Sequence, residues 1–267
     1  VCPSGVDYQH YVDFARTFIE RFNNRPLFDS FFRWFLAKTI PYPQRFRLSL
    51  LGARLLRPIA KLLGKQIEAA INQSPDNLPK NSILSLPKVF PAVGKGELKI
   101  ALLPGCAQQV LRPSINEATI RLLNRMGCEV VLANGVGCCG ALVHHMGRGE
   151  EAREFAKANI RAWNDQIDGE GLDSIVINAS GCGTEVKDYG HLFKNDDTWF
   201  TMAKRISSLT KDISEILVEL QLPKPVTRQL CTVVYHDACS LFHGQKIKEE
   251  PRLLLKQVGF KVLEIPG

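Results

Sequence analysis

Cysteine is the residue type with the clearest chemical potential in this 267-residue chain. The eight cysteines stand at positions 2, 106, 128, 138, 139, 182, 231 and 239. A small secreted disulfide scaffold would be shorter and much richer in cysteine. Four of them lie beside glycines, in the segments LPGCAQQ, NGVGCCGA and NASGCGTE: Cys106, Cys138, Cys139 and Cys182. Thiolates bind zinc and iron–sulfur clusters, so this set predicts a metal or cluster site.

Two features favour an iron–sulfur cluster over zinc. The adjacent Cys138 and Cys139 would be an awkward pair on one tetrahedral zinc ion, whose structural sites usually show C-x2–4-C spacing. The chain also opens VCPSGVDY, and Cys2-Pro3 matches the end of the C-x2-C-x2-C-x3-C-P run of ferredoxins. We therefore expect Cys2 to be a ligand of a ferredoxin-type [4Fe–4S] cluster, in a sequence cut inside that motif. The alternative is a surface thiol at a chain end.

The remaining candidates carry weaker signals. His144 and His145 follow the Cys-Cys-Gly motif closely and could tune a cluster or relay protons, or could be ordinary surface or core histidines. Cys128 and Cys231 stand just before predicted strands, so we expect both to be structural thiols.

Strands that alternate with helices must position the cysteines. Strands are predicted at 98–103, 129–133, 173–178 and 232–236, and helices at 114–126, 149–163 and 212–222. This alternation predicts an α/β fold with a parallel sheet and helices on both faces. Cys106, the Cys138–Cys139 pair and Cys182 each follow a strand, and the carboxyl ends of parallel strands share one sheet edge. We therefore expect these sulfur atoms to meet there.

The first of these helices has predicted boundaries. Ser114 and Glu117 have the spacing of a capping box, which predicts that the helix begins at Ser114. Gly127 can supply the left-handed residue that ends it.

Charge and proline content divide the chain into regions. Residues 1–95 carry 14 Lys/Arg against 6 Asp/Glu, whereas residues 96–267 are almost balanced, so the net charge of +7 belongs to the first part. Residues 1–70 are predicted to be a basic helical region after the truncated ferredoxin motif, and residues 71–97, with four prolines, a linker. No nucleic-acid-binding motif accompanies the charge, so we expect no nucleic-acid partner.

Residues 21–65 combine ten Lys/Arg with many aromatic side chains. Such a segment could lie on an anionic membrane surface or against a partner subunit. Alternatively, the aromatic side chains pack the helices onto one another. No hydrophobic run in the sequence has the character of a membrane span.

The cysteine-rich part repeats itself. IALLPGCAQ, a helix and MGCEVVLANG match VVYHDACSL, a helix and VGFKVLEIPG. Residues 98–225 are therefore predicted to be a first repeat and residues 226–267 the truncated start of a second, which leaves Cys239 as a ligand whose partners lie beyond the sequence.

These motifs resemble the cysteine-rich CCG-domain family, and within it the iron–sulfur subunits of glycolate oxidase (glycolate dehydrogenase). The stretches that carry the resemblance are CPSGVDY, GCAQQVLRPSINEAT, NGVGCCGALVHH, NASGCGTEVKDYGHLFKND and HDACSLFHGQK. Many members have C-x-x-C where this chain has Ala179 and Cys182. The first repeat therefore has four cysteines rather than five, and the noncubane clusters of heterodisulfide reductases do not carry over directly.

The resemblance implies an electron-transfer subunit. A FAD-bearing partner would oxidise glycolate to glyoxylate, and this chain would pass electrons through iron–sulfur clusters, with [4Fe–4S] expected, toward a quinone or another membrane acceptor. The implied ligands are Cys2, Cys106, Cys138, Cys139, Cys182 and Cys239, with no catalytic residue on this chain. The implied location is cytoplasmic, with a peripheral contact on the inner face of the membrane. Two alternatives are a heterodisulfide or thiol reductase subunit and a zinc-stabilised interaction module.

Overall fold

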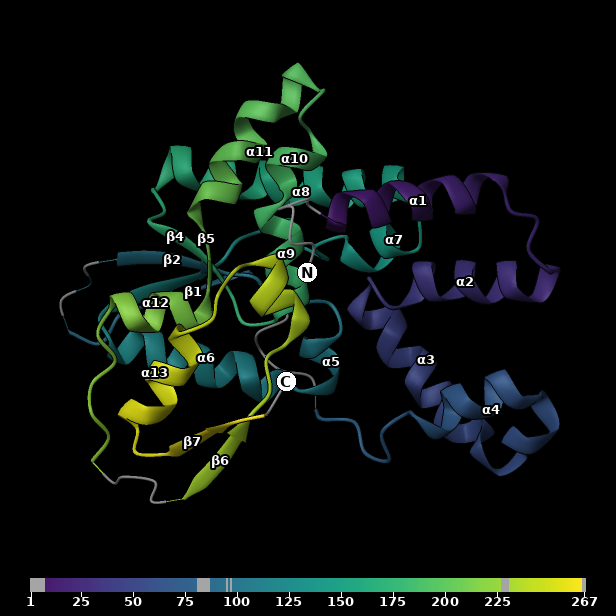
Figure 1. Ribbon diagram of the computed structural model, residues 1–267, viewed down its shortest axis with the longest axis horizontal. Coiled ribbons are helices and arrows are strands. Elements are labelled where there is room, and N and C mark those ends of the chain that lie inside the picture. Colours follow the sequence, from purple (N-terminus) through teal and green to yellow (C-terminus); the bar gives the residue numbers. More distant parts are fainter. Residues whose placement is uncertain (1–7, 81–86, 95, 97, 227–230, 266–267) are drawn as a thin grey trace.

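The computed structural model describes residues 8–80, 87–94, 96, 98–226 and 231–265 (Figure 1). The opening motif with Cys2 lies outside these residues. Among the residues described, no helix is both long enough and apolar enough to cross a membrane.

The basic N-terminal region is helical, as predicted. It consists of α1 (Tyr8–Phe22), α2 (Leu27–Thr39), α3 (Pro43–Leu56), a 3-10 helix (Arg57–Leu63) and α4 (Lys65–Asn72). Prolines open α3 and the 3-10 helix, because a fixed φ suits a first helical turn and the missing N–H would be unpaired there anyway. These helices extend to one side of the α/β body, on the right in Figure 1.

A five-stranded sheet forms the centre of the α/β body. Its order is β1 (Lys88–Phe90), β3 (Cys128–Leu132), β2 (Leu98–Leu102), β4 (Ser174–Ile177) and β5 (Thr210–Asp212). Strands β2 to β5 are parallel to their neighbours, and β1 runs antiparallel along the edge. The predicted α/β class is confirmed.

Helices cover both faces of this sheet. Alternate strand residues such as Ala101 and Ile175 face α8 (Gly149–Gly169), α9 (Ser180–Lys187), α10 (Tyr189–Leu192) and α11 (Asp197–Leu209). The residues between them, such as Ile100 and Val176, face α6 (Pro113–Arg125) and α12 (Ile213–Glu219). The helices α5 (Gln108–Leu111) and α7 (Ala141–His145) are short and lie in the loops that follow β2 and β3. The cysteine loops therefore lie at the end of a sheet that is covered by helices on both sides.

Two local predictions are corrected. The segment 71–97 is not only a linker, because its residues Lys88–Phe90 form the edge strand β1. Prolines 87 and 91 bracket this strand, and an edge is where a sheet tolerates proline.

The capping box predicted at Ser114 is also wrong. Helix α6 begins at Pro113, whose fixed φ and missing N–H suit the first helical position, and no side chain caps its N-cap residue. A true capping box occurs at α12, where Asp212 and Glu215 bond reciprocally to backbone N–H groups.

The strand predicted at 232–236 does not join the main sheet. β6 (Thr232–Tyr235) pairs in parallel with β7 (Lys261–Glu264) alone, with a π-helical turn (Ser240–Gly244) and α13 (Glu250–Gln257) between them. The pairing Val233 with Val262 corresponds in the predicted repeat to the pairing Ile100 with Val130. The two copies therefore share one strand register, which supports the predicted repeat.

Candidate functional site

The carboxyl ends of β2, β3 and β4 bring together the four glycine-flanked cysteines. The sulfur atoms of Cys106 and Cys138 lie 3.5 Å apart. Interaction with the thiols of Cys138 and Cys182 contributes to raising the pKa of the Cys139 thiol. All four thiols are free, so four sulfur ligands from three separate loops gather at one sheet edge.

Mutual hydrogen bonding sets the charge on these thiols. The pKa of Cys138 is lowered, because the thiols of Cys106 and Cys139 and the backbone N–H of Gly140 stabilise its thiolate. The pKa values of Cys106 and Cys139 are raised, because hydrogen bonding to Cys138 and burial both favour their protonated forms. The group thus holds one thiolate readily, and binding of a cation would be needed to ionise the rest.

A buried polar pair fixes the Cys-Cys-Gly loop. The Asn159 side chain of α8 accepts from the N–H of Gly137 at 2.8 Å and donates to the carbonyl of Cys138 at 2.9 Å. The hydroxyl of Tyr189 donates to the carbonyl of Cys139 at 2.8 Å and accepts from Asn159. Both side chains are fully buried, so the loop backbone is held from the side opposite solvent.

The Cys106 loop has its own polar support. Asn116 of α6 donates to the carbonyl of Pro104 and accepts hydrogen bonds from the amides of Gln108 and Asn178. Asn178 stands directly after β4, so this network connects the loop after β2 to the end of the neighbouring strand.

Sequence reasoning missed these supporting residues. Asn159 lies on the buried face of α8 beside Ala156, Ile160 and Trp163, and a polar residue at the spacing of these apolar ones is the signal that could have revealed it. Tyr189 had no comparable sequence signal, because a tyrosine in a helical segment is ordinary.

A cavity of about 520 Å³ borders two of the four thiols. Cys106 and Cys138 line it together with the loop after β3, and Tyr42 and Arg45 at the start of α3 line it as well. The basic N-terminal region therefore takes part in this site.

The spacing of the sulfur atoms bears on what they could bind. Four ligands on one zinc ion, at Zn–S distances of about 2.3 Å, would all lie about 3.8 Å from one another. In the described chain no three cysteine sulfurs lie within 4.8 Å of one another, so the four form an extended row rather than a compact tetrahedron. In a four-iron cluster each cysteine sulfur binds a different iron atom, so the sulfurs need not lie as close together as on one zinc ion.

The histidines after the Cys-Cys-Gly motif differ from each other. The Nδ1 atom of His144 lies 2.9 Å from the buried carboxylate of Glu185. Burial alone would lower the pKa of His144, but the hydrogen bond to Glu185 and its negative charge raise it overall. His145 is exposed and lies beside Asp13 and Arg16 of α1. Within the part of the chain that the structure describes, neither histidine makes a hydrogen bond to a cysteine sulfur.

The other described cysteines stand apart from this group. Cys128 is fully buried at the start of β3, the opposite end of the sheet, and burial raises its pKa. Cys231 is exposed before β6. Cys239 is also exposed, just before the π-helical turn, which packs on α9 through hydrogen bonds from Ser240 to Ser180 and from Thr184 to Ser240.

Comparison with known proteins agrees with this arrangement. The sequence profile of the cysteine-rich domain CCG matches residues 100–187. The chain is 35% identical over 265 residues to the glycolate oxidase iron–sulfur subunit of Escherichia coli (strain K12), covering 99% of this chain and 62% of that protein. It is 31% identical to the probable glycolate oxidase iron–sulfur subunit of Bacillus subtilis (strain 168), covering 97% of this chain and 60% of that protein.

A more distant relative matches only part of the chain. Lactate utilization protein A of Anoxybacillus flavithermus is 29% identical over 64% of this chain and 70% of its own length. No solved structure shows significant similarity to the chain. The chain spans about three fifths of the length of the two glycolate oxidase relatives. Residues 100–187 of this chain therefore match a cysteine-rich CCG domain, and along almost its whole length the chain is similar to the iron–sulfur subunits of glycolate oxidase.

Proposed function

We propose that this chain is an electron-transfer subunit of a glycolate dehydrogenase, and that Cys106, Cys138, Cys139 and Cys182 hold an iron–sulfur cluster. The observation that carries the proposal is the row of four free thiols from three strand ends, beside a cavity. The names of the similar subunits from Escherichia coli and Bacillus subtilis support the same assignment. A [4Fe–4S] cluster is proposed, and it would supply reversible one-electron transfer.

The chain's own residues would tune such a cluster. The N–H of Gly140 donates to the Cys138 sulfur at 3.4 Å, and hydrogen bonds to ligand sulfurs raise a cluster's reduction potential. Asn159 and Tyr189 donate hydrogen bonds to the carbonyls of Cys138 and Cys139 and so would hold the backbone of the two ligands in place. The proposed roles are therefore ligation, orientation and burial, with no proton abstraction from substrate by this chain.

The wider pathway is proposed from the relatives. Oxidation of glycolate to glyoxylate releases two electrons and two protons, and a FAD-bearing partner subunit would take them up. This chain would accept the electrons singly and pass them toward a quinone or another membrane acceptor. Cys2 and Cys239 are proposed as ligands of further clusters.

The N-terminal helices offer a docking surface for that pathway. Aromatic side chains of α1 and α2 remain exposed rather than buried between helices: Tyr11, Phe14, Phe18, Phe22, Phe28, Phe31 and Trp34. Exposed apolar rings among Lys and Arg side chains are typical of surfaces that bind anionic membranes or protein partners. We propose a peripheral membrane contact here, and a partner subunit is the alternative occupant.

Metal analysis of anaerobically purified protein tests the cluster. We expect iron and acid-labile sulfide in similar amounts and an electron paramagnetic resonance signal on reduction. Zinc without iron would replace this proposal with the zinc-stabilised interaction module. Turnover of a disulfide substrate by the reduced protein would favour the thiol reductase alternative instead.

A further inference from the structure

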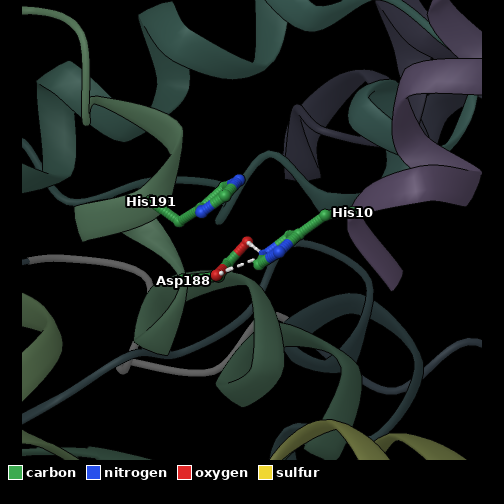
Figure 2. A group of neighbouring side chains, drawn as sticks. All are labelled: His10, Asp188 and His191. Atoms are coloured by element: carbon green, nitrogen blue, oxygen red, sulfur yellow. Dashed lines mark hydrogen bonds and ion pairs between the residues drawn. The ribbon is translucent and has the colours of Figure 1, made fainter. Parts of the chain in front are cut away.

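A second group of ligand-type side chains lies apart from the thiols. His10 comes from α1, His191 from α10, and Asp188 from the junction between α9 and α10 (Figure 2). One ligand atom from each residue lies within 4.8 Å of the others. The Nε2 atom of His10 is 3.0 and 3.1 Å from the two carboxylate oxygens of Asp188. None of these three residues is among the proposed cluster ligands.

We propose that His10, Asp188 and His191 bind a divalent transition-metal ion such as zinc or cobalt(II). Two imidazoles and one carboxylate form the donor set that such borderline ions prefer, whereas magnesium and calcium favour all-oxygen sites. Three protein ligands leave a coordination position for water, as in exposed zinc sites. The side chains of His10 and Asp188 are 26% and 23% exposed, so an ion can reach them from solvent.

The stacking of the two imidazole rings means that one of them must move when a metal ion binds. The rings of His10 and His191 are parallel within 2°, with centroids 3.5 Å apart. The lone pair of an imidazole nitrogen lies in the ring plane, so two parallel rings cannot both point at one ion. Metal binding therefore requires one ring to rotate out of the stack, which the partial exposure of His10 permits.

The positive charge of Lys194 opposes the binding of a metal ion at this site. The Nζ atom of Lys194 lies 3.3 Å from Nε2 of His191. A divalent ion beside this ammonium group would be repelled, so removal of the lysine charge should strengthen metal binding. A variant without the Lys194 charge should therefore bind the metal more tightly. Loss of folding could not produce such a gain in affinity.

Binding would join two distant parts of the chain. His10 and Asp188 are 178 residues apart in sequence, and the ion would connect the N-terminal helix α1 to the cysteine-rich domain. An ion that binds only the folded form stabilises it by mass action. We therefore expect zinc to raise the melting temperature as well as to bind.

Cobalt(II) titration of the full chain tests this site. The thiols also bind cobalt, but thiolate ligation produces an intense sulfur-to-cobalt charge-transfer band that nitrogen and oxygen ligands do not produce. We expect Asp188→Asn and His10→Ala to lose one equivalent of bound cobalt by elemental analysis while this band is unchanged. Lys194→Gln should bind that equivalent more tightly. His243 is also exposed, and the variant His243→Ala should bind as much cobalt as the wild type, so it serves as the histidine control.

Two results would overturn the proposal. One is an unchanged cobalt stoichiometry in both Asp188→Asn and His10→Ala, with circular dichroism showing that they are folded. The other is a zinc-induced rise in melting temperature that is equal in wild type and Asp188→Asn. The three residues would then be only an ion pair between helices. Iron and sulfide content reports separately on the thiol site, so failure here leaves the proposed function untouched.

Discussion

The phenol hydroxyl of Tyr189 donates a hydrogen bond of 2.8 Å to the carbonyl oxygen of Cys139. Tyr189 is fully buried, and burial raises its pKa well above the usual value, so the hydroxyl keeps its proton and remains a donor. The first residue of α10 therefore holds the main chain of a cysteine that is 50 residues earlier in the sequence. The Cys-Cys-Gly loop is therefore held by α10 as well as by β3, the strand that it follows.

Removal of that hydroxyl should loosen the loop. We expect Tyr189→Phe to lower the free energy of unfolding by about 1–3 kcal/mol, because a buried carbonyl loses its donor. A cluster bound there should also be lost faster in air. Urea denaturation and the decay of visible absorption measure the two effects. Equal stability and equal decay in the variant and wild type would contradict the positioning role.

Gly140 should tolerate alanine poorly. Its φ is +95°, and an added Cβ would lie 3.1 Å from the carbonyl oxygen of Ala152. Gly171 is a matched control, since its φ is +83° and an added Cβ would meet no atom within 4 Å. We expect Gly171→Ala to cost about 1 kcal/mol from backbone strain alone, and Gly140→Ala to cost more. Thermal unfolding of both variants checks this, and a smaller loss for Gly140→Ala would show that the contact is harmless.

The His144–Glu185 pair should make stability depend on pH. The folded pKa of His144 is raised above 6.5, so its contribution is complete below about pH 6.5 and disappears as the pH rises through the folded value. We expect wild-type stability to fall across that window and Glu185→Gln to show a smaller fall. Urea denaturation at a series of pH values measures both slopes. The same pH dependence of stability in wild type and Glu185→Gln would mean that Glu185 does not stabilise the protonated form of His144.

The thiols should differ sharply in their effect on bound iron. Cys138→Ser and Cys139→Ser each remove a sulfur from the contacting row, and we expect both to lose the cluster's paramagnetic signal in full-length protein. Cys231 is exposed and apart from the row, so Cys231→Ser should retain it. Iron analysis with electron paramagnetic resonance provides the measurement. Equal loss in all three variants, or in none, would count against the ligand assignment.

The exposed rings of α2 should drive vesicle binding. Phe31 is 60% exposed and Trp34 is 49% exposed. We expect the double variant Phe31→Ser with Trp34→Ser to pellet less with vesicles that contain phosphatidylserine. Leu253→Ser, which removes a 50% exposed side chain from α13, is the control and should pellet like wild type. Unchanged pelleting of the double variant would leave a partner subunit as the occupant of this surface.

Periodicity and glycine placement in the sequence determined much of the fold. Alternating strands and helices predicted the parallel α/β sheet, and residues such as Gly127, with φ of +83°, end a helix where expected. The strand-end position of each cysteine predicted that the four thiols would meet, because parallel strands present their carboxyl ends at one edge. These features are local or follow from general sheet topology, so a single sequence contains them.

Other features were decided only in the folded chain. The edge strand at Lys88–Phe90 depends on an open side of β3, and the start of α6 at Pro113 depends on the preceding loop. The hydrogen bonds of Asn159 and Tyr189 to the cysteine loop, and the stacking of His10 on His191, join residues 21 to 181 positions apart. Local propensity does not encode such distances; the packing of α1, α8 and α10 around the sheet brings these side chains together.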